Sequence, residues 1–503
     1  MKKIIFASAV VFALGLASCD DYLDINQDPN APAEEDVSTS MILPAVEMNL
    51  AATYGDYYRI TGGYYAQIYA HQFGTSNYVD YSQFKMSATR SSGSYTQLYQ
   101  KVILNAKTVA DKSAEAEDWG TYLAAVTLRA FAFQALVDVY GEVPYSEALD
   151  PSNLTPKYDE GIDVYKGVIA ELDEALSKAS DLLPVATSFL YKGQKADKWI
   201  QFAKSLKFKM LMRMGDVTSA QALISEGGFI TADVKLAGCW KEEAQQESPF
   251  WAEEFSTLGG STQINVVANL AIIGTMLQKD GEGNVTYQDP RLAKFFEPNK
   301  ASKEYKGNIS GTNMSTADKP FGTTDYWCRP VASFDMPVYF LTVSEIDFFL
   351  AEYYAIAGDA AKAGQYYEAA IKASCATNGL KDADAAKIIA KYPYDNSKYK
   401  ECIGVQKWIA LAGVNPFEAY CEARRLDYPA FDTTLKGSDM YSGKGALNVS
   451  AYKPGTFYTP FDVDAELGDN KLLERWPYAE SSQSRNAKTP KFKGFDTPIF
   501  WGE

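Results

Sequence analysis

The chain has 503 residues, of which 47% are hydrophobic, and this supplies enough apolar material for a large packed core. Its formal net charge of −16 argues against nucleic acid as a partner, because such binding relies on basic patches that release phosphate counterions. A single histidine, His71, and no Cys-x-x-Cys pair argue against a histidine-based metal site and a disulfide framework. The surrounding "YYAQIYAHQFG" predicts an aromatic helix face and a structural role for His71.

The first predicted element is a secretory signal peptide over residues 1–18. Lys2 and Lys3 precede an apolar run of 14 residues, which is shorter than the roughly 20 that a membrane-spanning helix needs. The end of this run, "LASC", resembles a bacterial lipobox. We therefore expect Cys19 to be the mature N-terminus and to be lipidated, with an ordinary signal peptide as the alternative. The other five cysteines are interpreted as small buried hydrophobic residues.

An acidic segment follows the lipidation motif. Oxygen-bearing side chains stand at the spacing of a calcium loop at Asp24, Asn26, Asp28, Asn30 and Glu35. Proline replaces the glycine that such a loop needs, and no helix fits in front of it. We therefore expect Asx-turn capping in an extended N-terminal arm, with no metal and no cofactor.

The strongest periodic segments are paired helices. Residues 121–141 and 162–179 form one predicted pair, and residues 199–224 form another with Gly-Asp at the turn. In residues 341–375 we expect a helix capped by Ser344, a break at Gly358-Asp359, and a second helix. The segment "YAIAGDAAKAGQYYEAAIKA" resembles a tetratricopeptide repeat, and such pairs must stack to bury their apolar faces. The predicted fold is therefore mainly all-α.

Irregular stretches rich in glycine and aromatic residues separate these helices, at residues 72–96, 238–262, 301–337 and 427–500. Long loops on a rigid scaffold are where binding residues usually lie. Three loop segments place aromatic rings beside hydrogen-bonding groups without a helical period. The candidate ligand-binding residues are Asn77, Tyr78 and Tyr81, then Phe250 and Trp251, then Asp325, Tyr326, Trp327 and Arg329. We expect Trp251 or Trp327 to stack on a ligand, and Asn77, Asp325 or Arg329 to bond its polar groups.

Two charged motifs have an alternative interpretation. Arg424 and Arg425 in "RRLDYP" form a fork suited to a carboxylate, although an internal ion pair at a helix end is the favoured interpretation. Glu253 and Glu254 in "WAEEF" resemble the paired carboxylates of a glycosidase. Adjacent residues of a helix point apart, however, which argues against a catalytic pair.

Several of these segments together resemble the SusD/RagB outer-membrane lipoproteins of Bacteroidetes. The matching segments are "CDDYLDINQDPNAP" (19–32), "DPRLAKFFEP" (289–298), "EIDFFLAEYYAIAGDAAKAGQYYEAAIKAS" (345–374), "IGVQKWIAL" (403–411), "FEAYCEARRLDYP" (417–429) and "ERWPYAESSQSRN" (474–486). The resemblance implies one SusD-like domain over residues 19–503, with tetratricopeptide-like helix pairs and long irregular loops. It also implies that Asp20 and Asp21 act as an export tag to the cell surface.

The same resemblance implies a function. The protein is expected to be a non-enzymatic, lipid-anchored glycan-binding protein of the outer membrane that acts as the lid of a SusC-like TonB-dependent transporter. A RagB-like peptide ligand is the alternative among binding proteins, and a helical glycoside hydrolase is the alternative from another class. The sequence does not identify the glycan.

Overall fold

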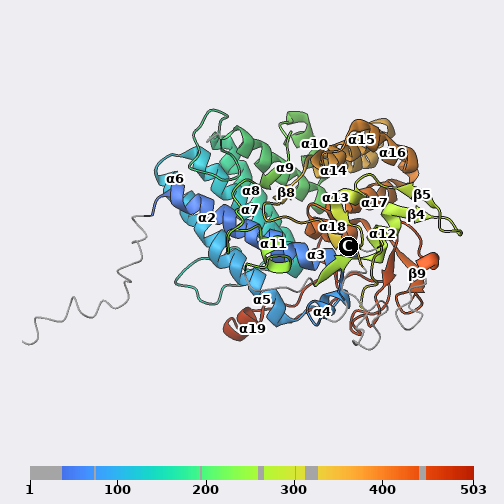
Figure 1. Ribbon diagram of the computed structural model, residues 1–503. Helices are drawn as coiled ribbons and strands as arrows, with labels where there is room; N and C mark the ends of the chain where they lie inside the picture. The colour runs from blue at the N-terminus through green and yellow to red at the C-terminus, as the bar shows by residue number, and fades with distance from the viewer. Residues whose placement is uncertain are drawn as a thin grey trace, which may run out of the picture.

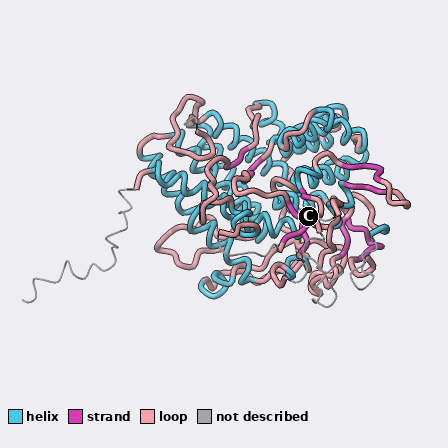
Figure 2. The backbone as a smooth tube through the Cα atoms, in the orientation of Figure 1, coloured by secondary structure: helices cyan, strands magenta, loops and turns pink. Residues whose placement is uncertain are grey.

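Helices dominate the protein, as Figures 1 and 2 show, and the strands are short, with several of them grouped at one end of the molecule among long loops. The computed structural model describes residues 37–72, 75–192, 195–258, 265–300, 302–311, 327–440 and 449–502. Cys19, the aspartate tag and the calcium-like segment lie outside the described residues, so these predictions are not tested. The same holds for Asp325 and Tyr326.

The α-helices of the described residues are α2 (Thr39–Ala52), α3 (Arg59–Tyr65), α4 (Val79–Ser82), α5 (Ala88–Gln97), α6 (Leu104–Glu115), α7 (Trp119–Tyr140), α8 (Gly161–Lys178), α9 (Asp197–Met214), α10 (Val217–Glu226), α11 (Pro249–Glu254), α12 (Leu270–Met276), α13 (Leu292–Phe295), α14 (Val343–Ile356), α15 (Ala360–Thr377), α16 (Asp382–Lys391), α17 (Tyr399–Ala412), α18 (Pro416–Leu426) and α19 (Glu480–Arg485). Two π-helical segments, η2 (Thr53–Tyr58) and η3 (Leu98–Ile103), and two 3-10 turns, η5 (Asn396–Lys398) and η6 (Val449–Ala451), complete the helical elements.

The strands pair two by two rather than forming one sheet. They are β1 (Tyr69–His71), β2 (Val234–Leu236), β3 (Val266–Ala268), β4 (Leu277–Lys279), β5 (Val285–Gln288), β6 (Phe296–Glu297), β7 (Arg329–Pro330), β8 (Val338–Leu341), β9 (Phe431–Lys436) and β10 (Phe457–Thr459). The antiparallel pairs are β1–β3, β2–β8, β4–β5 and β6–β7, and the parallel pair is β9–β10. Except for the hairpin β4–β5, each pair joins distant parts of the chain.

The predicted helix pairs are present as α7 with α8, α9 with α10, and α14 with α15. Gly215 and Gly358 adopt positive φ angles of 70° and 82° at the breaks, where a side chain would be strained. Asp216 and Asp359 then cap the second helices by accepting hydrogen bonds from backbone N–H groups. The Gly-Asp signal in the sequence thus located both turns correctly.

The predicted cap of α14 was wrong by two residues. Thr342, not Ser344, is the N-cap, because its hydroxyl and the carboxylate of Glu345 form a reciprocal capping box. Ser344 lies inside the helix and donates to the carbonyl of Ala370 at 2.8 Å, which ties α14 to α15. His71 lies on strand β1 rather than on a helix, and it is buried at 2% exposure beside Ser82.

Helix α7 forms the centre of the core. By length and composition alone it is the one described helix that could cross a membrane, but 89% of its apolar window is buried within the protein. The hydrophobic cluster around it includes residues from Leu43 to Trp501. Cys328, Cys375 and Cys421 are buried free thiols, as predicted, whereas Cys239 and Cys402 are only partly buried.

A buried ion network joins the helices behind this core. Arg213 of α9 reaches Asp138 of α7 at 2.6 Å, and Glu418 and Glu422 of α18 at 2.6 and 2.9 Å. All of these side chains are at most 2% exposed. Although burial alone would raise it, nearby cations such as Arg425 hold the pKa of Glu422 well below its ordinary value. The network fixes α18 against α7 and α9.

The predicted arginine fork belongs to this network. Arg425 donates to both carboxylate oxygens of Glu352 on α14, each at 2.6 Å, and Arg424 donates to the backbone carbonyls of Glu474 and Asp138. The favoured interpretation, an internal ion pair, is therefore confirmed for Arg425.

Helix α18 in turn positions α3. Phe417 stacks in parallel on Tyr58 with ring centroids 4.3 Å apart. A Cβ atom on Gly62 would lie 2.4 Å from the Cα of Phe417, so only glycine allows the two helices to approach this closely. The segment from η2 to α3 is thereby held rigidly, and one of its faces opens to solvent.

Candidate functional site

The π-helix η2 presents a polar group from an otherwise apolar segment. It follows α2 without a break, and its wider turn changes which residues face outward. Tyr54 and Tyr58 point into the core at 2% and 0% exposure, whereas Asp56 and Tyr57 are only partly buried. Segments of π-helix often occur at functional sites.

An open cleft of about 260 Å³ lies against this face of η2. Four groups of elements line it: η2 with α3, the turn into α4, α5, and α11. The lining residues are Asp56, Tyr57, Ile60, Tyr78, Tyr81, Arg90 and Glu253. Sites for drug-sized ligands measure about 300–1,000 Å³, so this cleft suits one small ring with its substituents.

Two tyrosines form the aromatic wall of the cleft. The rings of Tyr78 and Tyr81 are nearly parallel, with an interplanar angle of 10° and centroids 5.6 Å apart. Tyr78 is half-buried and has a left-handed backbone at the start of α4, while Tyr81 is 3% exposed and supports it from behind. The hydroxyl of Tyr78 donates to Oε1 of Glu253 at 3.2 Å, which connects α4 to α11.

Charged groups surround this wall. The guanidinium of Arg90 lies 5.0 Å from the ring centre of Tyr81 and pairs with Asp80 at 3.4 Å. Burial, together with the carboxylates of Glu253 and Glu254, raises the pKa of Asp56 to about 8. Asp56 is therefore mostly protonated at neutral pH.

Glu253 and Glu254 differ in exposure and in hydrogen-bond partners, which agrees with the prediction that adjacent residues of a helix point apart. Glu253 is exposed and accepts from Tyr78, whereas Glu254 is 2% exposed and accepts from the backbone N–H of Asn265 at 2.9 Å. Burial raises the pKa of Glu254. Glu254 thus holds the chain before β3 in place, and of the two carboxylates only Glu253 is among the lining residues of the cleft.

Asn77 and Trp251 lie next to cleft residues in the chain but do not line the cleft. Asn77 is exposed immediately before Tyr78. Trp251, on α11 with Glu253, is partly buried, stacks on Phe255 at 5.6 Å and donates to Glu247 at 2.9 Å. Both remain proposed ligand contacts.

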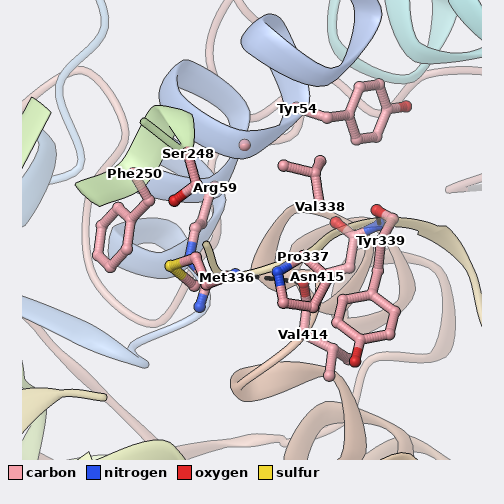
Figure 3. Close-up of a pocket in the computed structure, with 11 residues that line it drawn as sticks. Tyr54, Arg59, Ser248, Phe250, Met336, Pro337, Val338, Tyr339, Val414 and Asn415 are labelled. Carbon is pink, nitrogen blue, oxygen red and sulfur yellow. Dashed lines mark hydrogen bonds between the residues drawn. The ribbon is translucent and has the colours of Figure 1, made fainter. Parts of the chain in front are cut away.

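Phe250 belongs to the core. It is 1% exposed, stacks on Tyr69 with centroids 5.9 Å apart, and lies under the guanidinium of Arg59. Figure 3 shows it beside Ser248 and Met336 around an internal cavity of about 10 Å³, which is close to the volume that one water molecule needs. No sugar ring fits there, so we omit Phe250 from the proposed site.

The third predicted segment does not reach the cleft in the part that the structure describes. Trp327 is 4% exposed and so offers little ring surface to a ligand. Arg329 is partly buried on β7, opposite Glu297 on β6. Among the described residues, the structure brings together the first two segments, through Tyr78 and Glu253.

The sequence did not point to Asp56, Tyr57, Ile60 or Arg90 as site residues. Asp56 had a weak signal, since it is the one charged residue of "TYGDYY". Arg90 had none, because it lies in a polar segment of α5 that only the fold brings to Tyr81.

A larger cavity of about 460 Å³ lies near the C-terminal end of α18. Asp427, Phe431, Asn470 and Pro498 contribute to its lining, and an ion pair between Lys471 and Asp496 at 2.7 Å lies at its edge. It contains no stacked aromatic pair, so the smaller cleft is the better candidate for binding a ring.

Comparisons with known proteins agree with the fold. A family model described as SusD-like, "starch-binding associating with outer membrane", matches residues 29–443. A SusD homologue from Bacteroides uniformis ATCC 8492 superposes with a TM-score of 0.71 at 20% identity, covering 92% of this chain and 99% of its own. A chitin-binding SusD homologue from Flavobacterium johnsoniae gives 0.69 at 20% identity, covering 92% and 97%. A SusD/RagB family protein from Bacteroides thetaiotaomicron VPI-5482 gives 0.67 at 18% identity, covering 93% and 99%. A search of curated protein sequences found no match.

The fold and the family model define the class: a mainly helical binding protein associated with the outer membrane. The chain belongs to the SusD-like family, as the motifs between residues 19 and 486 predicted.

Proposed function

We propose that this protein captures an oligosaccharide in the cleft between η2, α4, α5 and α11 and does not cleave it. The parallel wall of Tyr78 and Tyr81, with Asp56, Arg90 and Glu253 around it, carries the proposal. An aromatic face with a few placed polar groups is what recognition of a sugar ring requires. The half-buried ring of Tyr78 contacts the ligand, and Asn77 and Trp251 extend the surface.

Replacement of Tyr78 tests this proposal. Titration calorimetry with soluble starch fragments and chitin oligosaccharides should show binding that Tyr78→Ala weakens by roughly 5- to 150-fold, by analogy with about 1–3 kcal/mol for stacking on a base. Tyr78→Phe, which keeps the ring, should lose less. Tyr366→Ala is a matched control, since Tyr366 stacks in parallel on Tyr354 at 5.4 Å outside the cleft.

Three outcomes would contradict the proposal. Native affinity in Tyr78→Ala would place the site elsewhere, with the larger cavity as the next candidate. Binding of a peptide mixture, but of no glycan, in a Tyr78-dependent manner would favour the RagB-like alternative. New reducing ends after incubation with glycans would favour a hydrolase.

We further propose that the protein is anchored through acylated Cys19, faces outward, and acts as the lid of a SusC-like TonB-dependent transporter. The family model's association with the outer membrane supports this localisation. Cys19→Ala should release soluble protein, and replacement of Asp20 and Asp21 should leave it lipidated but protected from protease added to intact cells. A mild-detergent pull-down should recover a large β-barrel, and recovery of the protein alone would count against the lid.

A further inference from the structure

We infer that the cleft selects its ligand by charge: it accepts neutral sugars and rejects sugars that carry a carboxylate or sulfate. This inference rests on the proposed function and adds the ligand class. It follows from how the charges around Tyr78 are already paired.

Arg90, the one cation among the described residues that line the cleft, is already engaged. Arg90 lies over the ring of Tyr81 and pairs with Asp80 at 3.4 Å, with both side chains partly open to solvent. Its charge is therefore offset by Asp80 before a ligand arrives. An anionic sugar would have to compete with Asp80 for the guanidinium nitrogen that this pair uses.

Two carboxyls line the cleft, those of Asp56 and Glu253. Within the described residues, neither Asp56 nor Glu253 forms an ion pair with a lysine or arginine. The proton held by Asp56 at neutral pH reflects its burial and its repulsion by Glu253 and Glu254. A ligand carboxylate would add a further negative charge to a cleft in which ionisation of Asp56 is already unfavourable.

Neutral hydroxyl groups of a ligand can hydrogen-bond to these carboxyls without electrostatic repulsion. Glu253 accepts one hydrogen bond from Tyr78 and has capacity to accept others, and protonated Asp56 can both donate and accept. These groups suit the mixed donors and acceptors of a sugar ring. Glu253 is thus the specificity-determining residue, because its exposed carboxylate repels an anionic ligand group and accepts a hydrogen bond from a hydroxyl group.

A glycan array that holds neutral glycans together with uronate- and sulfate-bearing glycans tests the inference. The hits should be neutral, or bear amines. The strongest binder is then titrated beside its carboxylated counterpart, and we expect at least a 10-fold weaker affinity for the latter. Added salt should improve binding of the carboxylated sugar by screening the repulsion and leave the neutral one unchanged.

Two variants isolate the cause. Glu253→Gln should narrow the gap in affinity between the neutral and the carboxylated sugar several-fold, because the carboxylated sugar should bind more tightly. Glu401→Gln changes the net charge of the protein equally at an exposed position of α17 and should leave the gap unchanged. Circular dichroism confirms that both variants fold.

The failures are distinguishable. Tyr78-dependent binding of glycans with no preference by charge, or with anionic glycans preferred, would overturn the charge selection and leave the proposed function standing. If Glu401→Gln reduces the difference in affinity between the two sugars as much as Glu253→Gln does, the selection results from the overall charge of the protein. This outcome would overturn the role of the cleft. No glycan bound at all would overturn both.

Discussion

The surroundings of Asp56 in the cleft raise its pKa and so change its protonation. Asp56 faces Glu253 and Glu254 of α11, Tyr78 and Tyr81 at α4, and Arg90 of α5. Its pKa in the folded protein, about 8, lies above the ordinary value of 3.8. The stabilising effect of this proton is complete below the ordinary value and is lost as the pH rises through 8.

Asp56→Asn should therefore stabilise the protein at pH 6 and stabilise it more at pH 9, because only the aspartate must take up a proton above its ordinary pKa in order to fold. One pKa unit corresponds to about 1.4 kcal/mol, and discounting for solvent at this partly exposed carboxyl leaves a difference of about 1–2 kcal/mol between the two pH values. Denaturant unfolding at both pH values measures it. An equal effect of the substitution at pH 6 and pH 9 would contradict the raised pKa.

Individual site residues were harder to predict than helices. The apolar spacing of residues 341–375 and its Gly-Asp break are local signals, and the structure follows them. Phe250 and Trp327 look like loop aromatics in sequence, yet contacts with distant segments bury them. Arg90 joins the cleft only because α5 packs beside η2, a contact that no local pattern encodes.

Among elements, α18 links the core to the cleft. Its Glu418 and Glu422 face Arg213 at the buried side, and its Phe417 supports Tyr58 of η2. The sequence predicted that Arg425 is paired, but it did not identify the partner Glu352, because α14 lies far away in the chain. The π-helical turn of η2 was also not predictable, since its composition resembles that of an α-helix.

Removal of the central cation should be costly. Arg213→Met leaves three buried carboxylates short of a partner, so unfolding free energy should fall by about 3–5 kcal/mol. Lys107→Met breaks an exposed pair with Asp111 on α6 and should cost under about 1 kcal/mol. Urea denaturation compares the two. Similar losses would mean that the buried network adds nothing beyond a surface pair.

At the scale of the whole molecule, several buried carboxyls favour the folded state in mild acid. Burial raises the pKa of Glu47 and Glu474 to about 7 and that of Asp347 to about 6. Each carboxyl stabilises the fold while protonated, and this contribution fades as the pH rises through its folded pKa. Below about pH 4 the unfolded chain protonates carboxylates such as Glu422, whose pKa in the folded protein lies well below the ordinary value, so the stability contributed by the ion network begins to be lost and opposes this trend.

The melting temperature should therefore be highest near pH 5 and fall by several degrees towards pH 8. Scanning calorimetry from pH 4 to pH 9 checks the profile. Glu47→Gln should flatten it, because Glu47 is fully buried and its replacement removes one titrating carboxyl. A melting temperature that rises from pH 5 to pH 8 would contradict the expected sign.

The single histidine has a consequence for spectroscopy. The chain has one imidazole, and burial raises the pKa of every thiol in the described residues, so few groups other than carboxyls add signals in the neutral range. Infrared difference spectra of the carboxyl C=O stretch between pH 5 and 8 then report on Asp56 and on the other carboxyls whose pKa is raised into this range. One Asn or Gln replacement at a time would assign each band, and occupancy of the cleft would be visible without any label.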